Sequence, residues 1–468
     1  MVRSKQDRNA NIEVYVCLIG WHNIQFYFMD ISLNTNSMHP REQITLVMQR
    51  IYKRVLTTTS GGNLSIMDDN GDIWITPTGV DKGLLKPSDI VCMKADGSII
   101  GDHKPSSEYP FHLAIYKARL DIKAIVHAHP PALVAFSIVR KTPNTNILPQ
   151  LRLLCGEIGY APYALPGSAE LGENIASQFR QGISAVIMEN HGTVIGGANI
   201  SNAYHKFESM EMTARSILYG NMIGKPAYLS NENITAYGVQ TLSVLPEVDN
   251  VSYPSAEREK RSEICKIVKR ACEQGLMLGA FGTVSARWRD DDFLITPDKC
   301  SNWDLKLDDI VQVKKGQREK GKYPCKSAYL HQEIYEKHKD VNAIIITQSP
   351  YLTSFAITGA EFNVRTIPET WIYLQNVQMV EFGEQFAGVH KIPSIISAEN
   401  PVVIVKNECV IVAGNKLLQA FDYLEVAEFS AKSLVLSTTL GKMIPISDGQ
   451  VEELGKVMSK WKNYEWTM

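Results

Sequence analysis

The sequence carries the same pattern twice, and this internal repeat is the feature that most limits how the chain can fold. Short matching segments recur at a separation of 219 or 220 residues along the 468-residue chain. Repetition over so long a period predicts that one domain-sized fold is present twice. The matching pairs are Gly62-Asn63-Leu64-Ser65 with Gly282-Thr283-Val284-Ser285, Ile75-Thr76-Pro77 with Ile295-Thr296-Pro297, Asp89-Ile90-Val91 with Asp309-Ile310-Val311, Ile115-Tyr116 with Ile334-Tyr335, and Ala124-Ile125 with Ala343-Ile344.

Local signals divide the chain into four segments. Residues 1–37 show no convincing helical period, and we interpret them as an N-terminal extension that is not native, with the natural start near Met38. A helix start follows at His39-Pro40-Arg41-Glu42, and its apolar spacing runs to Val55. The first unit is then 38–225. Proline and asparagine mark 226–258 as a linker, and the second unit is 259–468.

Two histidines near the middle of the first unit are candidate metal ligands. His127 and His129 follow an alternating apolar run that reads as the end of a strand, so both side chains leave the same face. Paired histidines also occur at ordinary polar strand ends, and spacing alone does not decide between the two interpretations. His191, expected at the end of a buried strand over 185–188, and the upstream carboxylate of Glu108 complete a set suited to zinc or a similar borderline metal.

Two glycine- and hydroxyl-rich stretches precede these histidines. Backbone N–H groups exposed by glycine, together with Asn, Ser and Thr side chains, can hold a phosphate without Lys or Arg. The same residues also simply make hairpin turns, which is the commoner situation for one such motif. The candidate phosphate-binding residues are Asn63, Thr78, Gly79, Ser106 and Ser107.

Helices are expected over 169–181 and from about 200 to 219. His205 and Glu208 lie in the second of these helices. We interpret them as surface or packing groups rather than as ligands, because a charged helix face is usually solvated.

The second unit lacks the candidate ligands. In the register of the repeat, Ile346 takes the place of His127, and Gln348 takes the place of His129. Ser327 stands opposite Glu108, and Glu408 stands opposite His191. A metal site does not survive such replacements. The second unit is therefore expected to be a structural or regulatory copy.

Composition and charge exclude several classes of function. The net charge is −2 with both signs mixed throughout, which gives no electrostatic case for nucleic acid or an anionic membrane. No apolar run approaches the roughly 20 residues of a membrane-spanning helix. The eight cysteines are scattered, which suits free thiols in a reducing compartment. We expect a soluble, cytoplasmic protein.

In this order along the chain, the motifs Gly62-Asn63-Leu64-Ser65, Thr76-Pro77-Thr78-Gly79, Pro105-Ser106-Ser107-Glu108, His127-Ala128-His129 and His191-Gly192 resemble those of the class II sugar-phosphate aldolases. That family also includes ribulose-phosphate 4-epimerases and the head domain of adducins. The second half resembles the family only in its scaffold residues.

The resemblance implies two tandem three-layer α/β/α domains, each with a mixed or largely antiparallel sheet. It implies one zinc ion, or another divalent metal, held by His127, His129 and His191 with Glu108 near it. It also implies an aldolase of the fuculose- or rhamnulose-phosphate type. Such an enzyme cleaves or forms a ketose 1-phosphate through a metal-bound enediolate, with Glu108 moving the proton if its pKa lies near working pH.

Aldolases of this family take a tyrosine from a neighbouring subunit of a fourfold ring. The first unit has no tyrosine in the corresponding stretch, Leu148-Pro149-Gln150-Leu151-Arg152-Leu153, whereas the second has Ile367-Pro368-Glu369-Thr370-Trp371-Ile372-Tyr373. We therefore hypothesise that two chains form a four-domain ring and that Tyr373 acts as a general acid at a first-unit site. The alternative is an aromatic side chain packed at the interface.

Two further functions stay open. A pentulose-phosphate 4-epimerase shares the intermediate, but the epimerases resembled carry aspartate at the position of Glu108. An adducin-like binding or scaffold protein needs no metal, and the intact set of ligands argues against it.

Overall fold

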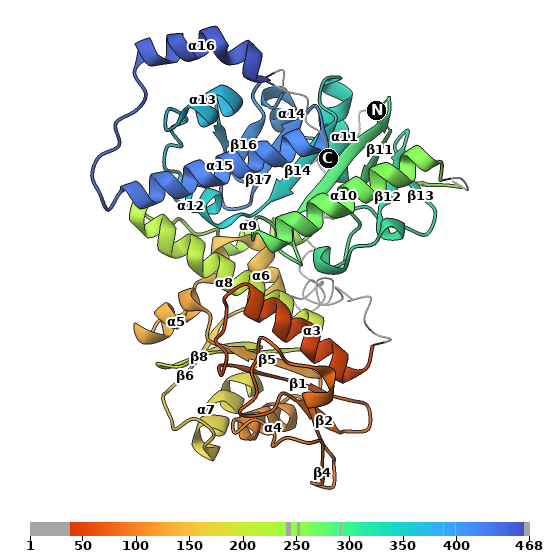
Figure 1. The fold of residues 1–468 in the computed structure, drawn as a ribbon, viewed down its shortest axis with the longest axis vertical. Helices are drawn as coiled ribbons and strands as arrows, with labels where there is room; N and C mark the ends of the chain where they lie inside the picture. The colour runs from red at the N-terminus through yellow and green to blue at the C-terminus, as the bar shows by residue number, and fades with distance from the viewer. Residues whose placement is uncertain are drawn as a thin grey trace, which may run out of the picture.

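The chain forms two sheets, one in each half, with helix α8 (Ile200–Ile223) lying between the halves (Figure 1). The computed structural model describes residues 38–239, 245–249, 253–290, 292–386, 388–397 and 399–462. The predicted extension 1–37 lies outside these residues.

The first sheet has eight strands in the order β4-β3-β2-β1-β5-β8-β7-β6. Neighbouring strands are antiparallel except for the β6–β7 pair, so the sheet is mixed and largely antiparallel, as predicted. The strands are β1 (Asn63–Met67), β2 (Ile73–Ile75), β3 (Val91–Met93), β4 (Ile99–Ile100), β5 (Ala124–Ala128), β6 (Gly159–Ala161), β7 (Ala185–Met188) and β8 (Gly192–Gly197).

Helices cover both faces of this sheet. Successive strand residues point to opposite faces. Val126 joins the core beneath α3 (Pro40–Lys53) and α8. Its neighbour Ile125 joins the core on the other face, beneath α4 (Tyr109–Ala118) and α7 (Ala169–Arg180). Two separate apolar cores on one sheet make a three-layer α/β/α domain. Its remaining helices are α5 (Pro131–Ile138) and α6 (Pro149–Cys155).

The second half repeats this arrangement. Its nine strands lie in the order β15-β16-β17-β14-β10-β11-β12-β13-β9. The strands are β9 (Glu247–Val248), β10 (Thr283–Arg289), β11 (Asp292–Ile295), β12 (Val311–Lys314), β13 (Gln317–Glu319), β14 (Ala343–Thr347), β15 (Gln378–Val380), β16 (Val402–Val405) and β17 (Cys409–Gly414). The helices are α10 (Ser255–Glu273), α11 (Ala328–Lys337), α12 (Pro350–Thr358), α13 (Pro368–Leu374), α14 (Lys391–Ile395), α15 (Leu417–Ser437) and α16 (Asp448–Lys462).

Strand pairing reproduces the register read from the repeat. Asn63 lies opposite His127 in the first sheet, and Thr283 lies opposite Ile346 in the second. The predicted fold class, two tandem α/β/α domains, is confirmed. The segment 226–258 is more structured than a linker: it contains α9 (Asn231–Gly238), β9 and the start of α10, and β9 gains backbone hydrogen bonds by pairing with β13.

The two halves meet along α8. Glu208 is buried there, and its carboxylate pairs with Arg54 and accepts hydrogen bonds from the Trp303 indole (2.9 Å) and the Gly279 amide (2.7 Å). His205 is also buried and bonds to Ser301. Of the two roles predicted for these residues, packing is therefore the one observed; they do not lie on a solvated face, because the second half covers that face.

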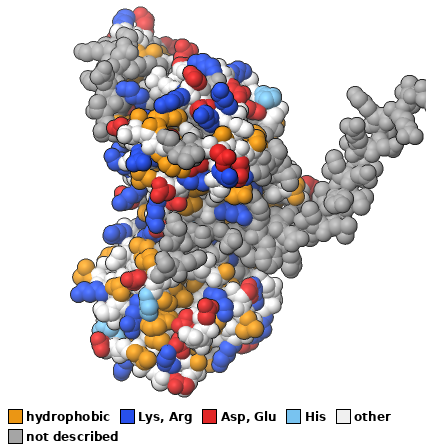
Figure 2. All heavy atoms as spheres, turned by 90° about the vertical axis from the view of Figure 1, so that its right-hand side faces the viewer, with side chains coloured by type: hydrophobic (Ala, Val, Ile, Leu, Met, Phe, Trp, Pro, Cys, Tyr) orange, Lys and Arg blue, Asp and Glu red, His pale blue; other side chains and the backbone are white. Residues whose placement is uncertain are grey.

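The described helices include none with the length and apolar character needed to cross a membrane. On the face drawn in Figure 2, basic and acidic side chains are interspersed in both halves, in keeping with the small net charge.

A buried glutamate from the long helix of each half accepts hydrogen bonds at the start of a shorter helix. Glu211 accepts from the backbone amides of Ala132 (3.2 Å) and Leu133 (3.0 Å) on α5. Glu428 accepts from those of Tyr351 and Leu352 on α12, both at 2.9 Å. These amides have no partner inside their own helices, so each carboxylate joins two helices of its half.

Removing either carboxylate should destabilise the fold. We expect Glu428→Ala to lower the free energy of unfolding by about 1–3 kcal/mol, since two buried amides lose their acceptor. Glu173→Ala is the control, because its exposed ion pair with Arg180 contributes little. Chemical unfolding followed by circular dichroism measures both, and equal midpoints for the two variants would contradict this role of Glu428.

Candidate metal centre

The end of β5 and the turn between β7 and β8 bring the three predicted histidines together. His127 is the fourth residue of β5, and His129 follows directly after that strand. His191 lies in the tight turn between β7 and β8, where Asn190 adopts a left-handed conformation (φ 51°). Asparagine tolerates that conformation better than most residues. Because β5 and β8 are neighbours in the sheet, the turn carries His191 to the end of β5.

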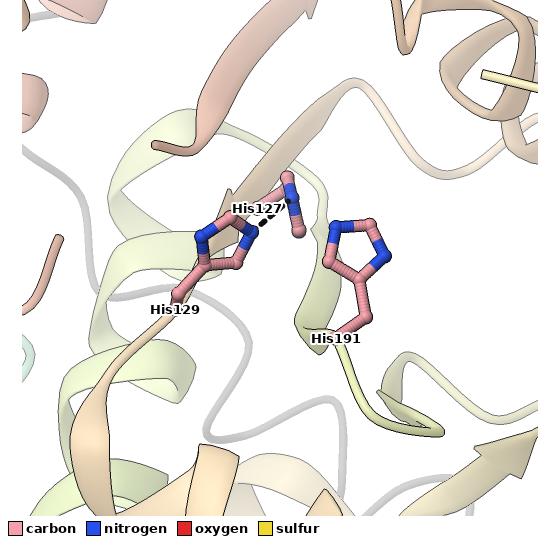
Figure 3. A group of neighbouring side chains, drawn as sticks. All are labelled: His127, His129 and His191. Atoms are coloured by element: carbon pink, nitrogen blue, oxygen red, sulfur yellow. Dashed lines mark hydrogen bonds between the residues drawn. The ribbon is translucent and has the colours of Figure 1, made fainter. Parts of the chain in front are cut away.

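The imidazoles converge on one point (Figure 3). One nitrogen from each ring can be chosen so that all three lie within 4.8 Å of one another, and within the described parts of the chain no other group of His, Cys, Asp or Glu side chains has the geometry to hold a metal. His127 Nε2 and His129 Nε2 are 3.1 Å apart. Two ligands of a tetrahedral ion at about 2.0–2.1 Å stand about 3.3 Å apart. The spacing therefore fits a zinc-sized ion.

A second hydrogen bond orients His127 for such a role. Its Nδ1 lies 2.9 Å from the carbonyl oxygen of Thr193, which can only accept, so Nδ1 carries the proton. The lone pair of the neutral ring then sits on Nε2, facing the other histidines. Partners of this kind fix the tautomer and ring orientation of metal-binding histidines.

Glu108 lies beside the histidines. One carboxylate oxygen is 3.2 Å from His127 Nε2, and the other is 3.3 Å from His191 Nε2. Oε2 accepts a hydrogen bond from the Asn63 amide (2.8 Å), whereas the buried Oε1 has no hydrogen-bond partner among the described residues. Its position as the residue before α4 places it at the mouth of the cluster rather than within it.

A series of hydrogen bonds between buried side chains leads from Tyr116 to Glu108. His112 Nε2 must donate to Asn63 Oδ1 (2.5 Å), so its Nδ1 accepts from the Ser65 hydroxyl (2.7 Å). Ser65 in turn accepts from Tyr116 (2.7 Å). The same series leaves the Asn63 amide directed at Glu108. It thereby fixes the hydrogen bond from Asn63 to this carboxylate.

Burial sets the charge state of the cluster. It lowers the pKa of His129 to about 3 and that of His191 to about 4, with neighbouring imidazoles contributing, so the free bases available to a metal are favoured. For Glu108, burial alone would raise the pKa, but His127, His191 and the Asn63 amide outweigh it and hold the pKa well below its usual range. The sequence-based condition that this pKa lie near working pH is not met here; the carboxylate is ionised.

Two glycines permit the close approach of the strands. A Cβ on Gly62, which has φ +74°, would lie 2.7 Å from the carbonyl oxygen of His127. A Cβ on Gly192 would lie 2.6 Å from the imidazole of His129. Neither contact is possible with a side chain, so both glycines are needed where they stand.

The predicted phosphate-binding residues gather next to the cluster. A bridge between Pro77 and Pro105 joins their two loops, and the amide of Thr78 donates to the Lys104 carbonyl (3.1 Å). Thr78, Gly79 and Ser107 are exposed on these loops, whereas Ser106 is buried and accepts a hydrogen bond from the Glu108 amide (3.3 Å). Asn63 is buried beneath them and already bonded to Glu108.

Sequence reasoning missed two supporting residues. Lys82 is buried, and its ammonium group donates to the carbonyls of Pro77 (2.7 Å) and Val80 (3.3 Å), which holds the loop that carries Thr78 and Gly79. His112 was missed as well. The repeat itself offered a signal, because His331 stands 219 residues after His112 and bonds to a serine that in turn bonds to a tyrosine, as His112 does.

Tyr373 is not placed near the histidines of its own chain. It packs against the core of the second half, where its ring centroid lies 5.9 Å from that of Tyr423. Any part in a first-unit site would have to come from a second chain, and this stays a prediction.

A sequence model of the class II aldolase and adducin N-terminal domain matches residues 42–218 and again residues 262–435. The chain belongs to this family. The two matches confirm both the resemblance and the tandem duplication. Members of the family generally depend on a divalent metal.

Individual relatives include lyases of two kinds. The L-fuculose phosphate aldolase of Methanocaldococcus jannaschii is 35% identical over 186 residues, which are 40% of this chain and 99% of that protein. The 3-oxo-tetronate 4-phosphate decarboxylase of Escherichia coli is 32% identical over 181 residues, 38% of this chain and 85% of that protein. A solved L-fuculose 1-phosphate aldolase is 31% identical, and the match covers 42% of this chain and 94% of that chain, with a TM-score of 0.39.

Loss of one imidazole should empty the metal centre. We expect His129→Ala to purify without stoichiometric metal while its circular dichroism spectrum is unchanged, because two remaining histidines hold zinc poorly. Elemental analysis by plasma mass spectrometry measures this. His103→Ala, which alters a half-exposed histidine paired with Asp89, should keep its metal. Full metal occupancy in His129→Ala would refute the assignment.

Proposed function

We propose that the chain is a zinc-dependent lyase that cleaves or forms a ketose 1-phosphate. The observation that carries this proposal is the convergence of three imidazoles, that of His127 buried and the other two partly buried, beside an ionised glutamate and next to two loops rich in hydroxyl groups and exposed backbone. The aldolase among its relatives supports the reaction class.

The roles of the chain's own residues follow from their contacts. His127, His129 and His191 would hold the metal, which when bound supplies a Lewis acid that stabilises negative charge developing on substrate oxygen. Thr78, Gly79, Ser106 and Ser107 would hold the phosphate through hydroxyl and backbone donors. These four residues lie on the two loops that the Pro77–Pro105 bridge joins.

Glu108 would move the proton. Its Oε1 is buried and makes no hydrogen bond to the described residues, so an acceptor faces the site. Because the carboxylate is held ionised, it begins the reaction as a base that takes a proton from substrate carbon. The Asn63 amide keeps Oε2 occupied and so restricts proton transfer to Oε1.

A decarboxylase is the second candidate. The relatives that act as 3-oxo-tetronate 4-phosphate decarboxylases favour it, at 32% identity. Both reactions leave negative charge next to a carbonyl group, which is the charge that the metal would stabilise. A screen of purified protein against ketose 1-phosphates, measuring the released aldehyde, and against 3-oxo-tetronate 4-phosphate, measuring released CO2, separates them.

Contacts within one chain also support a two-chain assembly. Gln150 at the start of α6 donates to Glu408 of the second half (2.5 Å), and Asn407 donates to the carbonyl of Ile147 (3.0 Å). The first half thus docks its α6 segment on the turn that corresponds to the one carrying His191.

Among the described residues, the equivalent segment of the second half is more exposed than the α6 segment. Ile367, at the start of α13, is 45% exposed, whereas the matching Leu148 is 3% exposed. We propose that a second copy uses its α13 segment to cover the His191 turn, so that two chains make a ring of four domains. By the same comparison, Glu369 matches Gln150 and would be the residue that reaches across.

Tyr373 occupies the position of Leu154, which is buried in the core of its own half. We therefore expect Tyr373→Phe to leave turnover close to that of the unaltered protein, since packing depends on the ring and not on the hydroxyl. Steady-state kinetics test this. A large loss of turnover in Tyr373→Phe would instead support the catalytic hypothesis.

Substitution of the proposed base should separate chemistry from metal binding. Glu108→Gln keeps the size of the side chain, so we expect normal metal content with turnover lowered by about 10²–10⁴-fold, the usual contribution of proton transfer. Glu157→Gln, at an exposed glutamate, is the control. Near-normal turnover in Glu108→Gln would leave this residue a structural role only.

A further inference from the structure

The second half keeps a hollow where the first half has its metal centre. The hollow has a volume of ≈ 150 Å³, the space of about five water molecules at roughly 30 Å³ each. Ser327, Ile346 and Gln348 line it at the positions of Glu108, His127 and His129. Residues from outside the second domain close it: Gln150 from α6 and Tyr237 from α9.

One wall of this hollow presents acceptors that lack donors. Gln150, Gln348 and Glu408 are each at most 6% exposed. Each has one side-chain oxygen without a hydrogen-bond partner among the described residues: Oε1 of both glutamines and Oε2 of the glutamate. Buried polar atoms left in this state are costly. All three residues line the hollow, and a ligand that brings hydroxyl donors would supply the missing partners.

The state of Glu408 adds to this polarity. Burial raises its pKa to about 7, although bonds from neighbours, Gln150 among them, lower it. Its carboxyl group can therefore exist in either form near neutral pH, and it can accept from or donate to a ligand hydroxyl.

The opposite wall carries positive charge that the first half lacks. Lys299 replaces Gly79 and Lys326 replaces Ser107 on the two loops, which a bridge between Pro297 and Pro324 again holds side by side. Asp298 lies between them and offsets part of the charge, but burial raises its pKa. Burial likewise lowers the pKa of Lys326, and the two lysines add positive charge to this wall, which suits an anion.

We propose that this hollow binds a small polyol phosphate without a metal ion. The phosphate lies at Lys299 and Lys326, and the hydroxyl groups donate to the free oxygens of Gln150, Gln348 and Glu408. An amide and an aliphatic side chain stand where imidazoles hold the metal in the first half, so recognition rests on hydrogen bonds and charge. Because Gln150 and Tyr237 come from outside the second domain, the occupied site also joins the two parts of the chain.

Calorimetric titration of the full chain, freed of metal by a chelator, tests this with glycerol 3-phosphate as the probe. We expect Lys326→Met to weaken binding by about tenfold or more, because a charge-assisted hydrogen bond is lost. Lys320→Met is the matched control, since this exposed lysine of the same half pairs with Asp249 outside the hollow, and binding should be unchanged. Gln348→Leu should weaken glycerol 3-phosphate more than inorganic phosphate.

Three binding results would overturn the proposal. Equal affinities for Lys326→Met and Lys320→Met would remove the anion site from the hollow. Binding of glycerate as tight as that of glycerol 3-phosphate would assign a carboxylate ligand instead. Loss of binding in Ser107→Ala, with Lys326→Met unaffected, would place the phosphate in the first half. None of these results depends on turnover, so they are distinct from a failure of the proposed lyase activity.

Discussion

A chain of buried hydrogen bonds is the constraint on which both sites depend, and it joins β1 to α4 in the first half and β10 to α11 in the second. In the first half it runs from Tyr116 through Ser65 and His112 to Asn63, and ends on Glu108. Burial lowers the pKa of His112 to about 3, so the ring stays neutral and keeps one donor and one acceptor. That polarity directs the Asn63 amide at Glu108.

The second half keeps the first three residues of this hydrogen-bond chain and has different residues at its end. Tyr335, Ser285 and His331 repeat the first three members, and His331 then contacts Thr283 (3.2 Å), which contacts Ser327 (3.1 Å). The scaffold is thus preserved, while a hydroxyl stands where the first half has a carboxylate. Ile346, which takes the place of His127, joins one of the two apolar cores of the second half, so the replacement of that ligand extends the core rather than weakening it.

The local sequence pattern was sufficient to predict much of the fold and the grouping of the three histidines. The strand at 185–188 and the helices beginning at Pro40, Ala169 and Ile200 follow from periodicity and helix starts, and β5 presents His127 as its alternation predicts. Long-range contacts could not be read in this way. Glu208 and His205 resemble a solvated face until the second half covers them, and Gln150 meets Glu408 across 258 residues of sequence. Nor does sequence reveal that His127, His191 and the Asn63 amide together hold the pKa of Glu108 low.

The central claim is that the duplicated chain carries one metal centre, in its first half, and a second site of different chemistry. Metal content per chain, measured by plasma mass spectrometry after saturation with zinc and removal of loosely bound ions, tests it most directly. The structure predicts one ion per chain, because the group His127, His129 and His191 occurs once among the described residues. Two ions per chain, or none, would contradict it.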